Sequence, residues 1–171
     1  LELTSRNIDR KIKWTTTLIL NYYSDKITSY YLPPQPASFF VGTTQPNISG
    51  VVGKPVYSVY SYQWAGLDPQ TGDPLGELNK QPSNDYLSLT GPSTLQADLA
   101  YNGSVLPVYF GSLGNHLSWK NLSLDLRVTY KLDCYFRRSS IDYSSLVYGR
   151  GGHSDFALRW QKPGDEMHTN V

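Results

Sequence analysis

Apolar and polar side chains alternate without interruption from Leu122 to Leu132. The even positions are apolar and the odd positions are polar. Successive side chains of a β-strand point to opposite faces, so this pattern predicts a strand with one apolar and one polar face. The apolar side chains are Leu122, Leu124, Leu126, Val128, Tyr130 and Leu132, and the polar ones are Ser123, Asp125, Arg127, Thr129 and Lys131.

The length of this segment sets it apart from the strands of most soluble domains. Strands there usually end after about 5 to 6 residues, whereas residues 122 to 132 would reach about 36 Å at roughly 3.3 Å per residue. Tilted by about 40°, such a strand covers the roughly 25 Å apolar band of an outer-membrane barrel. The charges on its polar face are typical of a surface that meets water. The pattern therefore favours a membrane strand.

Two further segments share the alternation. Residues 10 to 23 carry aliphatic side chains on one face, bracketed by Trp14 and Tyr22, as in the aromatic girdles of membrane barrels. Residues 108 to 119 directly precede the segment 122–132, from which only Lys120 and Asn121 separate them. We expect strands at about 10–30, 108–119 and 122–137.

A turn at Lys120 and Asn121 predicts the register between the last two strands. Trp119 then lies opposite Leu122, Leu117 opposite Leu124, and Leu113 opposite Val128, so the apolar faces coincide. On the polar face, His116 lies opposite Asp125 and Gly114 opposite Arg127. Asn115 opposite Leu126 and Gly111 opposite Tyr130 are the two mismatches.

Residues 32 to 107 lack a long alternating segment. Prolines and glycines are frequent from residue 31 to 55, regularity returns only briefly at residues 56 to 64, and residues 66 to 74 are rich in turn formers. We expect one large external excursion at about 32–107 with no membrane-crossing strand, two crossings being the alternative. A further loop is expected after residue 139.

Composition excludes several classes of protein. No run approaches the roughly 20 apolar residues of a membrane helix. A net charge of +1 without a basic cluster argues against nucleic acid as a partner. Cys134 is the only cysteine, so the chain has no internal disulfide and no cysteine-based metal site. We expect no metal and no cofactor.

Candidate ligand contacts come from four aromatic rings within the excursion, at Tyr57, Tyr60, Tyr62 and Trp64. Flat amphipathic rings suit a glycan-binding surface, and the alternative is that they pack the loop. His116 with Asp125 suggests either acid–base chemistry or a hydrogen-bonded pair. Nothing local completes a nucleophile, base and orienting group, so we predict no catalytic residue and no enzyme activity.

Several motifs, in order along the chain, resemble the barrel of the SusC/RagA family of TonB-dependent outer-membrane transporters. These motifs are WTTTL at 14–18, NY at 21–22, KIT at 26–28, GKPV at 53–56, YSY at 60–62, WAGLDP at 64–69, TGDP at 71–74, YFG at 109–111, WKNLSL at 119–124 and RWQKPGD at 159–165. They cover most of the chain.

The resemblance implies an all-β fold, an antiparallel up-and-down meander forming an open partial segment of a large transmembrane β-barrel. Barrels of that family have about 22 strands, and we expect residues 1–171 to supply a few strands of the later part. The implied function is glycan or oligopeptide uptake across a bacterial outer membrane, without any nucleic-acid partner. The implied partners are outer-membrane lipid, a SusD-like surface lipoprotein, and TonB through an N-terminal plug region absent from this chain.

In such a barrel, Trp14, Tyr22, Trp119 and Tyr130 would form the membrane-girdle aromatics. The alternative is a soluble secreted β-sandwich that binds carbohydrate as a separate module. A sandwich would cover the apolar faces with a second sheet, whereas a barrel covers them with lipid.

Overall fold

The structure is a computed structural model, and it describes residues 1–41 and 47–171. Residues 42–46, which fall within the expected excursion, lie outside the described part. The chain divides into two compact units. The first, the sheet unit, contains Leu1–Tyr31, Ile48–Ser58 and Gly103–Tyr135. The second, the loop unit, contains Leu32–Asn47, Val59–Asn102 and Phe136–Val171.

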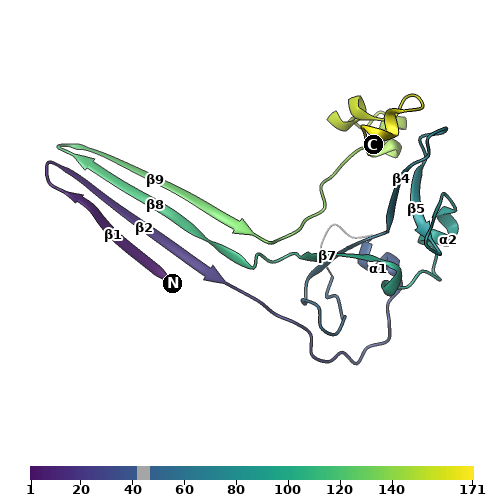
Figure 1. The fold of residues 1–171 in the computed structure, drawn as a ribbon, viewed down its shortest axis with the longest axis horizontal. Coiled ribbons are helices and arrows are strands. Elements are labelled where there is room, and N and C mark those ends of the chain that lie inside the picture. Colours follow the sequence, from purple (N-terminus) through teal and green to yellow (C-terminus); the bar gives the residue numbers. More distant parts are fainter. Residues whose placement is uncertain (42–46) are drawn as a thin grey trace. The chain divides into compact units, whose positions relative to one another are not determined.

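Four antiparallel strands form the sheet unit, in the order β1-β2-β8-β9 (Figure 1). Their bounds are β1 (Glu2–Asp9), β2 (Ile12–Tyr22), β8 (Tyr109–Trp119) and β9 (Leu122–Leu132). β2 pairs directly with β8, so no strand from the described residues between them enters this sheet. The sheets among the described residues are antiparallel and none closes into a barrel.

The register between β8 and β9 confirms the sequence prediction. Trp119 pairs with Leu122 and Leu113 with Val128, and His116 pairs with Asp125. The same faces continue onto β2, where Leu18 pairs with Leu113 and Tyr22 with Tyr109. Apolar positions therefore share one face across three strands.

The ends of the strands differ from the sequence prediction. The strand expected over residues 10–30 ends at Tyr22, and the one expected over 122–137 ends at Leu132. Asp133 follows with a φ of +54°, which is incompatible with a continuing strand. The alternation does not predict β1, because a bulge between Arg6 and Ile8 interrupts its two-residue period.

The apolar face of the sheet is exposed along its length. On β9, the five aliphatic side chains retain between 56% and 68% of their accessible surface. Trp14 and Trp119 lie near the β8–β9 turn, whereas Tyr22 and Tyr130 lie toward the opposite end. The Tyr22 ring is 5.4 Å from the ring of Tyr109. Aromatic side chains thus bracket an aliphatic zone.

Asn115, the first mismatch, is accommodated by a polar cluster on the apolar face. Its Oδ1 accepts hydrogen bonds from Trp14 Nε1 at 3.0 Å and from the Thr16 hydroxyl at 2.8 Å. Asn7, in the β1 bulge, donates to the Thr16 oxygen at 2.6 Å and accepts from Ser5. The cluster links β1, β2 and β8.

Gly111, the second mismatch, makes room for Tyr130. A Cβ on Gly111 would lie 2.6 Å from the Tyr130 hydroxyl oxygen and 1.9 Å from the Ile19 carbonyl oxygen. The Tyr130 hydroxyl donates to that carbonyl at 3.0 Å. A side chain on β9 therefore reaches across β8 to β2.

Short elements make up the loop unit. β4 (Trp64–Leu67), β5 (Pro74–Leu78) and β6 (Gln81–Ser83) form a small sheet. β3 (Ser58–Ser61) pairs with β7 (Ala100–Ser104), and residues 59–61 and 100–102 of these two strands belong to the loop unit. The helical turns are α1 (Ala37–Val41), α2 (Tyr86–Thr90), η1 (Gln96–Asp98), α3 (Tyr143–Val147), η2 (Ser154–Leu158) and η3 (Asp165–Met167). No helix among the described residues has the length and apolar content to cross a membrane.

The core of the loop unit is small and aromatic. Ala37, Tyr60, Leu67 and Leu99 are its buried apolar side chains among the described residues. Trp160 packs directly on Gly72, where a Cβ would lie 2.4 Å from the indole ring. The TGDP and RWQKPGD motifs are therefore in contact.

Two glycines of β8 give a matched test of the sheet. Gly111→Ala should lower the free energy of unfolding by about 1–3 kcal/mol, because the new methyl group meets backbone. Gly114→Ala should not lower it, since the nearest atoms lie at 3.8 Å and alanine costs roughly 0.5–1 kcal/mol less than glycine in a strand. Urea unfolding followed by circular dichroism measures both. Equal effects of the two substitutions would contradict this account of Gly111.

Candidate functional site

The four aromatic rings proposed as ligand contacts occupy different environments. Tyr57 belongs to the sheet unit and is partly exposed, forming an isolated bridge with Ile48. Tyr60 is 1% exposed and packs against the rings of Phe40 and Tyr101, at 5.5 and 5.6 Å. The prediction for Tyr60 as a ligand contact is therefore wrong, because its ring is part of the core.

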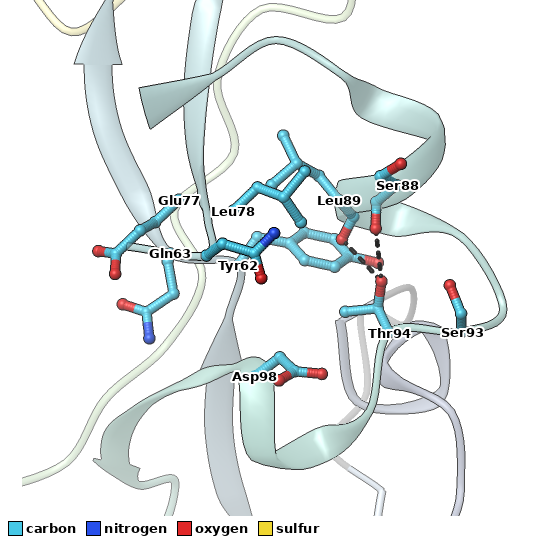
Figure 2. Close-up of a pocket in the computed structure, with 10 residues that line it drawn as sticks. Tyr62, Gln63, Glu77, Leu78, Ser88, Leu89, Ser93, Thr94 and Asp98 are labelled. Carbon is cyan, nitrogen blue, oxygen red and sulfur yellow. Dashed lines mark hydrogen bonds between the residues drawn. The ribbon is translucent and has the colours of Figure 1, made fainter. Parts of the chain in front are cut away.

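Tyr62 and Trp64 lie in the loop unit outside that core. Trp64 begins β4 and is 52% exposed. Tyr62 is half-buried and lines a hollow of about 290 Å³. Figure 2 shows its ring beside Leu78 and Leu89, with Asp98 across from it. The lining residues are Tyr62, Gln63, Glu77, Leu78, Asn79, Ser88, Leu89, Ser93, Thr94 and Asp98.

One wall of this Tyr62 hollow is fixed by the hydrogen bonds of α2 and the turn after it. Asp85 caps α2 by accepting from the backbone N–H of Ser88 at 3.2 Å. The Thr94 hydroxyl donates to the carbonyl oxygens of Ser88 and Leu89 at 3.0 and 3.1 Å (Figure 2). Leu89 packs closely over Gly76 of β5, where a Cβ would lie 2.8 Å from it. The hollow is thus built before any ligand arrives.

Polar groups complete the lining of the Tyr62 hollow. Asp98 accepts the backbone N–H of Leu95 at 2.8 Å through Oδ2. Asn79 is placed by the β5–β6 turn, where it and Lys80 both have positive φ. Amide, hydroxyl and carboxylate groups around a tyrosine ring suit a small ligand rich in hydroxyl groups. The sequence pattern singles out Tyr62 but not Glu77, Asn79 or Asp98, since nothing local indicates that these segments converge.

Neither the family models nor the curated proteins compared with this chain match it. The case for the Tyr62 hollow therefore rests on its geometry.

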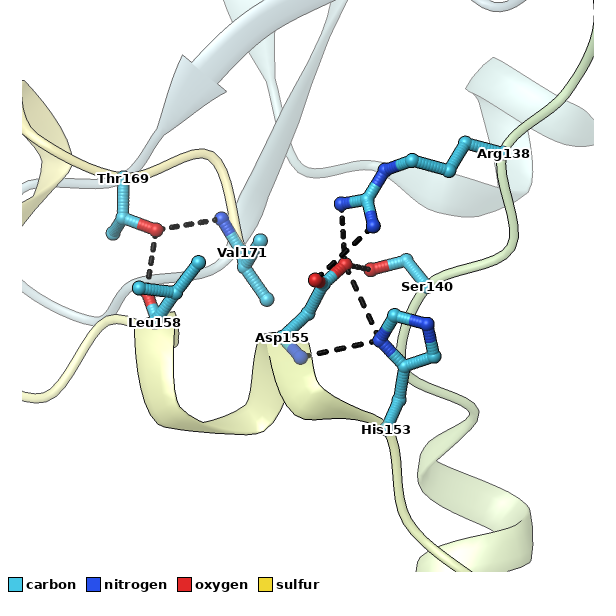
Figure 3. A network of polar contacts seen from close by, with 7 residues as sticks. All are labelled: Arg138, Ser140, His153, Asp155, Leu158, Thr169 and Val171. Atoms are coloured by element: carbon cyan, nitrogen blue, oxygen red, sulfur yellow. Dashed lines mark hydrogen bonds and ion pairs between the residues drawn. The ribbon is translucent and has the colours of Figure 1, made fainter.

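A second polar cluster in the loop unit surrounds Asp155, which is 4% exposed (Figure 3). Arg138 binds both carboxylate oxygens, at 3.1 and 2.5 Å, and the Ser140 hydroxyl donates at 2.7 Å. His153 Nδ1 accepts the backbone N–H of Asp155 and lies 3.4 Å from Oδ2. The carboxylate is fully engaged, so this cluster fastens residues 138–140 to η2.

His116 and Asp125 lie together on the polar face of the sheet unit. His116 Nδ1 is 2.7 Å from Asp125 Oδ1, and both side chains are well exposed. This geometry is a hydrogen-bonded pair across neighbouring strands. Among the described residues, no three histidine, cysteine or acidic side chains gather as a metal site.

The Asp155 cluster predicts an acid-sensitive loop unit. Hydrogen bonds from Arg138 and Ser140 hold the pKa of Asp155 below its usual value. A lowered pKa in the folded state stabilises the fold above the unfolded-state value of about 3.9. That stabilisation is lost as the pH falls through the lower folded-state pKa. Asp155→Asn should therefore reduce stability at pH 7 and flatten its decline below about pH 4.

Chemical unfolding at a series of pH values measures this effect. Asp133→Asn, which alters an exposed carboxylate of the sheet unit, is the matched control and should leave the profile unchanged. An Asp155→Asn profile parallel to that of the unaltered chain would contradict the proposed role.

Proposed function

We propose that this chain forms part of the wall of an outer-membrane importer of the SusC/RagA type. The observation that carries the proposal is the exposed apolar face of an antiparallel sheet whose opposite face is polar. Eleven-residue strands β2, β8 and β9 extend that face beyond the usual length of soluble strands. In the wall of a barrel, lipid would cover the apolar face and water would solvate the polar face.

The energy of the apolar face supports this assignment. Burying one large aliphatic or aromatic side chain is worth about 1.5–3 kcal/mol, so the six apolar positions of β9 amount to about 9–18 kcal/mol. Surfaces of this kind are rarely left in water by soluble monomers. Aromatic rings at the two ends of the aliphatic zone are the usual arrangement at bilayer interfaces.

The outer edges of β1 and β9 support an open segment of a larger wall. Neither edge pairs with another strand among the described residues, and unpaired backbone groups are not tolerated in hydrocarbon. In the proposed importer, neighbouring barrel strands of the complete protein pair with both edges. In importers of this type, TonB acts through a plug region.

The loop unit then serves as part of the external substrate surface, beside a SusD-like lipoprotein. Its Tyr62 hollow suits a segment of a glycan, with an oligopeptide as the other cargo of this class. In this proposal the chain has a passive transport role at the bacterial outer membrane and no catalytic one.

A cysteine scan of β9 tests the membrane assignment. In a Cys134→Ser background, spin labels are placed singly at residues 123 to 128, and the chain is reconstituted in lipid vesicles. Labels at 124, 126 and 128 should be accessible to oxygen, which partitions into lipid, and not to a water-soluble nickel chelate. Labels at 123, 125 and 127 should show the reverse.

The same scan distinguishes the alternative fold. In a soluble carbohydrate-binding β-sandwich, labels at the even positions would be shielded from both reagents by a second sheet. Uniform accessibility to the nickel chelate would mean that the face meets water. Either result would overturn the membrane assignment.

Binding at the Tyr62 hollow is tested separately on an array of neutral oligosaccharides. Tyr62→Ala should weaken binding at least about tenfold, because one aromatic anchor is worth more than about 1.4 kcal/mol. Trp64→Ala should also weaken binding if the exposed indole extends the same surface. Tyr148→Ala is the control and should bind as the unaltered chain does, because this exposed ring of the loop unit does not line the hollow. Unchanged affinity in Tyr62→Ala would remove the hollow as a binding site.

A further inference from the structure

A glycine leaves a hollow on the polar face of the sheet unit. Gly114 of β8 lies between Thr17 of β2 and Arg127 of β9. The adjacent row on the same face contains Thr15, His116 and Asp125. These six residues line the hollow together with Asn115 and Leu126. A side chain at residue 114 would fill its centre.

The side chain of Arg127 lies over Gly114 and lines this hollow. Its Nε lies 3.8 Å from the position that a Cβ on Gly114 would occupy. Within the described part of the chain, Arg127 has no ion pair or side-chain hydrogen bond. Its guanidinium therefore presents a set of unused donors beside β8.

Two threonines beside Arg127 add hydrogen-bond donors, and His116 binds the acidic side chain of the hollow, Asp125. Thr15 and Thr17 are half-buried, and their hydroxyls make no hydrogen bond among residues 1–41 and 47–171. Asp125 is engaged by His116 at 2.7 Å rather than by Arg127. The hollow thus combines one free cation with two hydroxyl donors.

We propose that this hollow binds the carboxylate group of a small solute. A guanidinium fork matches the two oxygens of a carboxylate, and the hydroxyls of Thr15 and Thr17 can donate to the same oxygens. Asp125 remains close enough to repel a second negative charge, which favours a singly charged carboxylate over a phosphate ester. The inference rests on the sheet unit alone and holds whether or not the Tyr62 hollow binds glycans.

The test uses the complete chain and a matched pair of sugars. Galacturonate and galactose differ in the carboxylate, and each is titrated at constant ionic strength while the imidazole Cε1–H signals are followed by NMR. The His116 signal should shift saturably with galacturonate and not with galactose. His153 and His168, both in the loop unit, are internal controls whose signals should stay in place.

Two substitutions on the polar face of β9 complete the design. Arg127→Gln should weaken galacturonate binding at least tenfold. Lys131→Gln removes the same charge from the same face, opposite Phe110, and should bind galacturonate as the unaltered chain does. Glucose 6-phosphate should bind more weakly than galacturonate.

Four results would overturn the proposal. The first is an equal shift with galactose, and the second is equal binding by Arg127→Gln and the unaltered chain. The third is an equal loss in the two variants, which would mean that only the net charge of the face matters. The fourth is tighter binding of glucose 6-phosphate, which would overturn the choice of a carboxylate. Because the His116 signal is measured in the unaltered chain, it tests the proposal even if a variant fails to fold.

Discussion

The exposed apolar face of the sheet is the constraint on which the other features of the sheet unit depend. Three eleven-residue strands hold their apolar side chains in common register, and the described part of the chain leaves them uncovered. Whatever covers this face must be apolar and must extend along the whole strands. The opposite face carries polar and charged side chains, among them the hydrogen-bonded pair of His116 and Asp125, and these require water or polar partners. The two faces therefore demand different surroundings.

Local periodicity explains how much of the sheet can be predicted from the sequence. β8 and β9 are joined by two residues, so one turn and one alternation determine every pair between them. β1 escapes detection because its bulge at Asn7 shifts the period. The end of β9 depends on one backbone angle, that of Asp133, which the side-chain pattern does not encode.

The loop unit is harder to predict because its contacts join distant segments. Tyr60 and Tyr62 are two residues apart and look equivalent in the sequence, yet one ring fills the core and the other lines the hollow. Phe40 and Tyr101, which pack against Tyr60, come from other parts of the chain, and so does Asp98, which lines the hollow with Tyr62. The same holds for Asp155, whose arginine partner precedes it by 17 residues.

Asn115 and Gly111 have a consequence for how the sheet finds its alignment. An unbroken leucine alternation is nearly periodic, so sliding β9 past β8 by two residues would keep apolar opposite apolar. Such a slip would separate Tyr130 from Gly111 and force its ring against a residue with a side chain. A comparable slip of β2 would place Trp14 or Leu18 opposite Asn115 in place of Thr16, and the amide would lose the hydrogen bond from the Thr16 hydroxyl. The two mismatches in the pattern thus single out one alignment among several of similar hydrophobic energy.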